Sequence, residues 1–159
     1  MTITNEQEWV QLLTDLALRL NQECGTRQNG ASHDEYAGFS YDEGALCSAI
    51  AAPFQSVFGA PRYESVYDRA AALMAHIAKA HAFRDGNKRT ALKLSLVYLT
   101  MRGIRVVPPS AELGAQLVEK CVLANGNQFE QMVVEISTFL IAWTVPDQIA
   151  REHRRNVQG

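Results

Sequence analysis

One stretch of eleven residues, His81 to Ala91, constrains this chain more than any other feature. It reads His-Ala-Phe-Arg-Asp-Gly-Asn-Lys-Arg-Thr-Ala, and apolar sequence lies on both sides of it. The stretch combines an imidazole, a carboxylate, a glycine, an amide side chain and basic residues. No purely structural element needs that mixture, so the fold is expected to present it at a turn between two packed segments.

The apolar sequence on either side predicts two helices. Before the stretch, apolar side chains recur at three- and four-residue spacing, which gives a helix one buried face; they are Val66, Ala70, Leu73, Met74, Ile77 and Ala78. After it, the residues up to Leu99 are apolar or small nearly all round, and only Lys93 is charged. The first helix is therefore expected to end near His81. The second should be buried and begin at about Asn87 or Lys88.

A turn of this composition predicts a phosphate site. The start of a helix presents unpaired backbone N–H groups at the positive end of the helix dipole, where an anion is favoured. Lys88 and Arg89 add full charges, Asp85 can hold Mg²⁺ beside bound phosphates, and His81 can accept a proton near neutral pH. The alternative is a capped helix start with surface charges. It explains each residue alone but not their concentration before a buried helix.

These residues resemble the signature of the Fic/Doc superfamily, and specifically its Doc (death-on-curing) branch of toxins from bacterial toxin-antitoxin pairs. The wider Fic pattern is roughly HxFxxGNGRxxR. The Doc branch has lysine at the second glycine and lacks the final arginine, as this chain does at Lys88 and Leu92. The upstream segment from Glu43 to Pro53 is similar to the family's GxLxxAIxxP stretch. The similarity spans roughly residues 44–107.

The resemblance implies a role for each matching residue. His81 would deprotonate the acceptor hydroxyl, Phe83 would pin the loop into the core, and Asp85 would bind Mg²⁺. The catalytic group would be completed by Lys88 and Arg89. The nucleotide phosphates would be bound by consecutive residues of the turn and the first helical turn: Gly86, Asn87, Lys88, Arg89 and Thr90. Lys79 departs from the Doc pattern, which has arginine there.

The activity implied is that of an ATP- and Mg²⁺-dependent kinase that transfers the γ-phosphate to a hydroxyl side chain of a protein. The family suggests elongation factor Tu as the target, so that translation stops, and a Phd-like antitoxin on a separate polypeptide as the restraint. Two alternatives stay open. One is a Fic-type transferase that moves AMP, and the other is a catalytically silent interaction module with the same fold.

The region from Pro53 to Tyr63 has two interpretations. In the resembled fold it is a flap that lies over the active site and aligns the target by strand-like pairing. Otherwise it is an ordinary interhelical loop with Phe54 and Phe58 buried. His76 lies five residues before His81, which puts the two side chains on different helix faces, so we expect a packed or surface histidine rather than a metal pair.

The remaining sequence predicts an all-α fold, a single Doc-like helical bundle over residues 1–159 with a motif core at about 44–107. Helices are expected around Trp9–Leu20 with an Asn5 and Glu8 cap, over Tyr41–Ala52, from Ser110, and over Phe129–Trp143. An extended segment should follow Gly103, a loop should run from Glu23 to Ser40, and residues 150–159 should fray. His33 and Asp34 in that loop are interpreted as solvated residues rather than ligands.

Composition limits the partners and the cellular location that we expect. A formal net charge of −2 argues against direct nucleic-acid binding. No apolar run is long enough for a membrane span, and the start lacks a signal-peptide pattern, so we expect a cytoplasmic protein. Three widely spaced cysteines fit reduced thiols.

Overall fold

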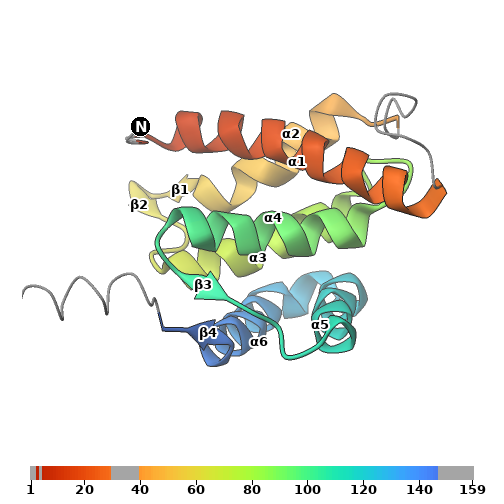
Figure 1. Cartoon of the computed structure of the whole chain (residues 1–159). Coiled ribbons are helices and arrows are strands. Elements are labelled where there is room, and N and C mark those ends of the chain that lie inside the picture. Colours follow the sequence, from red (N-terminus) through yellow and green to blue (C-terminus); the bar gives the residue numbers. More distant parts are fainter. Residues whose placement is uncertain (1–2, 4, 30–39, 147–159) are drawn as a thin grey trace, which may run out of the picture.

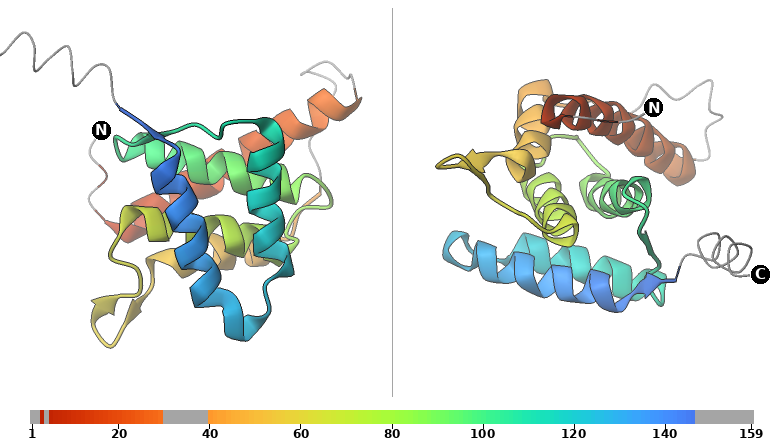
Figure 2. Two further views of the ribbon diagram at one scale, coloured as in Figure 1. Left: turned by 90° about the horizontal axis from the view of Figure 1, so that it is seen from below. Right: turned by 90° about the vertical axis from the view of Figure 1, so that its left-hand side faces the viewer.

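Two antiparallel helices, α3 (Val66–Ala80) and α4 (Asn87–Met101), form the middle layer of the fold. The computed structural model describes residue 3 and residues 5–29 and 40–146. On one side of the middle layer lie α1 (Glu6–Asn29) and α2 (Glu43–Ala51), and on the other lie α5 (Ala111–Leu123) and α6 (Phe129–Ala142) (Figures 1 and 2). The predicted all-α bundle is confirmed. None of the described helices is long and apolar enough to cross a membrane.

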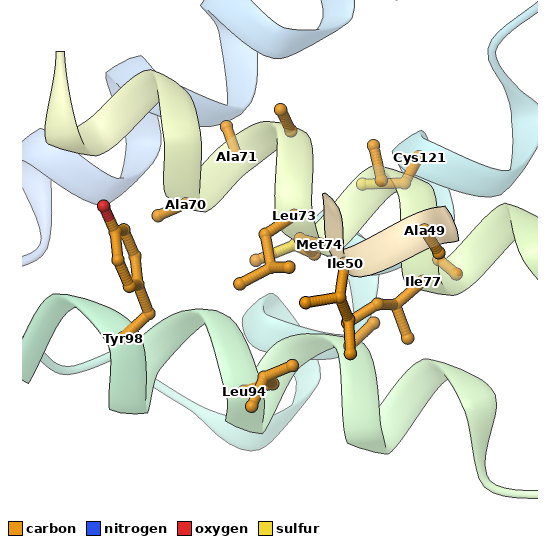
Figure 3. Close-up of a cluster of buried hydrophobic side chains, with 14 of the residues drawn as sticks. Ala49, Ile50, Ala70, Ala71, Leu73, Met74, Ile77, Leu94, Tyr98 and Cys121 are labelled. Carbon is orange, nitrogen blue, oxygen red and sulfur yellow. The ribbon is translucent and has the colours of Figure 1, made fainter. Parts of the chain in front are cut away.

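Helix α3 is central because its residues are small enough to be packed from several sides. Most of its residues are buried, and five of these are alanines; the buried set is Ala70, Ala71, Ala72, Leu73, Met74, Ala75, Ile77 and Ala78. Larger side chains from its neighbours fill the space around it, including Ile50 of α2, Leu94 of α4 and Cys121 of α5 (Figure 3). This packing fixes where α3 ends, and therefore where the stretch from His81 begins.

The predicted boundaries of the central pair are confirmed. Helix α3 ends at Ala80, directly before His81, and α4 begins at Asn87. The chain leaves α4 through Gly103, whose φ of 81° is in the left-handed region that glycine adopts readily. Ser110 caps α5 by accepting a hydrogen bond from the Leu113 N–H, as the sequence predicted.

The predicted loop from Glu23 was wrong in its first part, because α1 continues to Asn29. Asn21 and Cys24 are buried and extend the core-facing stripe that runs through Leu13 and Ala17. The spacing of these residues is helical. A search for apolar residues alone does not detect it, because Asn21 within the stripe is polar. His33 and Asp34 lie outside the described residues. At the start of the same helix, the predicted cap is present, with Asn5 accepting from the Glu8 N–H.

The segment between α2 and α3 forms a 3₁₀ turn (Ala52–Phe54) and a short hairpin of β1 (Ser56–Val57) and β2 (Ala60–Pro61). Its two-residue turn has positive φ at Phe58 and Gly59, the geometry that suits a tight hairpin. Phe54 is buried as one interpretation expected, but Phe58 at the tip is fully exposed, which that interpretation did not expect.

The hairpin lies at the opposite end of α3 from His81 (Figures 1 and 2). Helix α3 has 15 residues and is therefore about 22 Å long. The placement over the active site that the resemblance implied is not what this structure has, because α3 separates the hairpin from the motif by its full length.

A second pair of short strands lies next to the end of α6. β3 (Arg105–Val106) pairs antiparallel with β4 (Thr144–Val145). The extended segment after Gly103 was predicted, but its partner was not. Helix α6 ends at Ala142, and a second 3₁₀ turn (Gly126–Gln128) precedes it. The pairing ties the connection between α4 and α5 to the end of α6.

Lys79 of α3 forms hydrogen bonds with the end of α5. Its ammonium group donates to the carbonyl oxygens of Cys121 (3.2 Å), Val122 (3.4 Å) and Ala124 (2.5 Å). These carbonyls lie at the carboxyl end of α5, where backbone acceptors lack helical partners and the dipole favours a cation. Lys79 therefore fastens α5 to the last turn of α3.

We expect Lys79→Met to lower the free energy of unfolding by about 1.5–3 kcal/mol, because hydrogen bonds to a charged donor are lost from half-buried carbonyls. Urea unfolding followed by circular dichroism measures this. Lys79→Arg keeps the charge and donors and should retain most of the stability. Equal stability of Lys79→Met and the wild type would contradict the fastening role.

Tyr98 of α4 is completely buried, and its hydroxyl forms no hydrogen bond with any described residue. Its ring packs edge-on against Trp9 (5.2 Å between ring centroids) and Phe54 (5.7 Å). The ring therefore contributes apolar packing, while the hydroxyl loses its contacts with water.

Because a buried hydroxyl without a partner is destabilising, Tyr98→Phe should unfold at the same or a higher urea concentration, with a gain of up to about 2 kcal/mol. The measurement is the unfolding midpoint at constant m-value. A loss of more than about 1 kcal/mol would mean that the hydroxyl has a stabilising partner.

Candidate active site

The loop between α3 and α4 reverses the chain with two residues in the left-handed region. His81 follows the last residue of α3 with φ 48° and ψ 41°, and Gly86 precedes α4 with φ 78°. Left-handed backbone costs a residue with a side chain about 1–2 kcal/mol, although histidine adopts it more readily than most. The loop must therefore be held by contacts around it.

Phe83 and Asn87 provide the first of these contacts. The Asn87 side chain accepts a hydrogen bond from the Phe83 N–H (3.0 Å) and donates one to the Phe83 carbonyl (2.8 Å). The Phe83 ring is 3% exposed and lies against the Tyr41 ring, 5.9 Å away. Asn87 thus closes the loop on itself while Phe83 anchors it in the core.

The segment before α2 supplies a second contact through its backbone. The Asp42 N–H donates to the Ala82 carbonyl (2.7 Å), and the Arg84 N–H donates to the Ser40 carbonyl (2.9 Å). Between them, Tyr41 and Phe83 form an isolated antiparallel bridge. The loop is therefore paired along one edge, like a strand, before it turns into α4.

A third contact comes from α1, beneath the loop. The buried Asn21 side chain donates to the Asp85 carbonyl (2.9 Å) and to the Thr90 hydroxyl (3.3 Å). Thr90 is itself 0% exposed. The sequence placed Thr90 among the phosphate-binding residues, but its side chain faces α1 and supports the loop from behind, because the buried side of α4's first turn points that way.

The outer side of the loop forms a pocket of about 430 Å³. It is lined only by residues of the motif: His81, Arg84, Asp85, Gly86, Asn87, Lys88 and Arg89. The structure therefore brings together all the predicted site residues except Phe83 and Thr90, which lie behind the loop. The side chain of His81 is exposed at this pocket, where it can meet an incoming group.

The amino end of α4 opens into this pocket without a side-chain cap. Asp42, Ser65 and Ser110 cap α2, α3 and α5, whereas Gly86 at the start of α4 has no side chain to offer. The N–H groups of the first helical turn have no helical acceptor and favour an anion. The pocket thus combines unpaired donors with the basic groups of Arg84, Lys88 and Arg89.

Asp85 is the one carboxylate lining the pocket. Its Oδ1 accepts a hydrogen bond from the Gly86 N–H (2.7 Å), and its Oδ2 accepts none from the described residues. Within the described residues, no three His, Cys, Asp or Glu side chains form a metal-binding group. This donor set fits Mg²⁺, which binds one or two carboxylates together with phosphate oxygens.

Sequence reasoning missed Arg84 and Asn21. Arg84 lies inside the motif and adds a third basic group to the pocket, so its charge was the available signal. Asn21 is 64 residues from Asp85, and nothing local in the sequence indicates that they meet. His76 packs against Phe129 (4.8 Å between ring centroids), away from the pocket, and burial lowers its pKa.

Comparison with known proteins identifies the family of the chain. The Fic/DOC family model matches residues 10–99, more than half of the chain, and the chain belongs to the Fic/DOC family. A relative, Toxin Doc of Mycolicibacterium smegmatis, is 40% identical over 65 residues. The match covers 41% of this chain and half the length of that relative.

Because Asn21 supports two parts of the loop at once, Asn21→Ala should lower the free energy of unfolding by about 1–3 kcal/mol. It should also speed hydrogen exchange at the loop amides of residues 82–87. The exposed neighbour Glu23→Ala is the matched control and should change neither. Unaltered exchange in Asn21→Ala would show that the loop does not depend on α1.

Proposed function

We propose that this protein is a Doc-like toxin kinase that transfers the γ-phosphate of ATP to a hydroxyl side chain of a protein target. The observation that carries the proposal is the uncapped amino end of α4, which opens into a pocket lined by His81, Asp85, Lys88 and Arg89. Family membership and the relative named as a toxin support the assignment as a Doc-like toxin.

Each residue has a part in the transfer. His81 takes the proton of the target hydroxyl, whose oxygen then forms a bond to the γ-phosphorus as the bond from that phosphorus to the ADP oxygen breaks. The backbone N–H group of Asn87 and the cations of Lys88 and Arg89 stabilise charge on the phosphates. Mg²⁺ held at Asp85 would neutralise charge on the phosphate oxygens.

Lys88 favours γ-phosphate transfer over AMP transfer. A long cation fills space that a glycine would leave open beside the loop, and Leu92 stands where the wider Fic pattern has a second arginine. Without that arginine, the far phosphates of an ATP bound in the AMP-transferring orientation have one cation fewer. ATP bound in the orientation that presents its γ-phosphate for transfer does not need that second arginine.

The wider biological setting is also part of the proposal. A kinase that stops translation by modifying elongation factor Tu in the cytoplasm would harm its own cell. We therefore propose restraint by a separate, Phd-like antitoxin. The relative's name, Toxin Doc, supports this assignment.

The decisive experiment incubates the protein with a cell lysate and ATP labelled at either the γ or the α position. A kinase transfers label only from the γ position and adds about 80 Da to the target, whereas AMP transfer carries the α label and adds roughly 329 Da. Label transferred only from the α position would replace the kinase assignment. Transfer of neither label would favour the silent interaction module.

His81→Ala should lower the transfer rate at least about 100-fold, because general-base catalysis contributes that much or more. His81 is exposed, so the fold should be kept, although alanine adopts the left-handed backbone of this position less readily and should lower the stability slightly. The matched control is His76→Leu. It also removes a histidine, but one that lies within α3 and away from the pocket, so the transfer rate should be unchanged. Growth arrest that persists in His81→Ala would exclude catalysis by this residue as the cause.

A further inference from the structure

Lys88 is already engaged by a carboxylate from another helix. Its Nζ lies 2.7 Å from Oε2 of Glu119 on α5, and the two side chains are 56% and 45% exposed. No other described pair joins a residue of the motif to an acidic side chain outside it. Nothing in the proposed transfer assigns a part to Glu119.

The pair stands at the border between two cavities. Lys88 and Arg89 line both the loop pocket and a second cavity of about 630 Å³ between α4 and α5, which Cys24 of α1 also reaches. Glu119 lines only the second cavity. The carboxylate therefore holds the Lys88 ammonium group on the α5 side of α4.

A shift of α5 that would carry Glu119 after Lys88 is opposed by contacts near both ends of this helix. At its end, Lys79 of α3 binds the backbone carbonyls. In its first turn, Gly114 lies so close to α4 that an added Cβ would come within 3.1 Å of the Leu92 side chain. When Lys88 moves, Glu119 stays and the ion pair opens.

We propose that Glu119 is a positioning residue that restrains Lys88 while the site is empty and gives it up to the phosphates when ATP binds. This inference rests on the proposed function. A triphosphate offers several negative charges against the single charge of Glu119, so the exchange runs toward the phosphates. Because exposed ion pairs are weak, the restraint reduces nucleotide affinity only about two- to fivefold.

The test measures binding of Mg²⁺ with a non-hydrolysable ATP analogue by calorimetry. Glu119→Gln should tighten binding about two- to fivefold without changing the melting temperature. In kinetics it should lower the KM for ATP and leave kcat unchanged. Glu112→Gln removes the same charge two turns earlier on α5, about 10 Å away, and should bind like the wild type.

A double variant separates restraint of Lys88 from plain charge repulsion. In a Lys88→Met background, Glu119→Gln should have no further effect, because the residue it acts through is gone. Tightening of equal size in that background, or weaker or unchanged binding by Glu119→Gln alone, overturns the inference and leaves the kinase assignment intact. Absence of binding in the wild type and every variant overturns the proposed function and this inference with it.

Discussion

The amino end of α4 is held entirely from behind and from the sides, and this leaves its front free for an anion. Asn87 closes the loop onto Phe83, Asn21 supports it from α1, and Tyr41 pairs with it along one edge. None of these contacts uses the N–H groups that face the pocket. Gly86 offers no side-chain cap, so these contacts, rather than a cap, hold the start of α4 in place.

The central pair was predictable because its signals are local. The three-and-four spacing from Val66 and the apolar run after Ala91 define two helices, and the turn formers between them define the boundary. The lining of the loop pocket was predictable for the same reason, since His81 to Arg89 are neighbours in the chain and most of them line this one pocket.

What could not be predicted depends on contacts between distant residues. Asn21 appears to end a helix when only hydrophobicity is considered, yet it is buried because Asp85 and Thr90 give it partners. The same contact turns Thr90 from an apparent phosphate ligand into a support. The position of the hairpin follows from the length of α3. The strand β3 pairs with Thr144 and Val145, which lie almost forty residues later in the chain.

Helix α5 contacts two residues of α4 at or next to the motif. Leu92, at the position where the wider Fic pattern has arginine, lies against Gly114, so that part of α4 serves packing between helices. Lys88, one turn earlier, is paired with Glu119. A cationic side chain at position 92 would have to leave this apolar contact with Gly114 to reach the phosphates. Whenever it packed against α5 again, its charge would lose contact with water and pay a desolvation penalty. The close packing of α5 on α4 therefore agrees with a site that has Lys88 and lacks the second arginine, the combination on which the proposed γ-phosphate transfer rests.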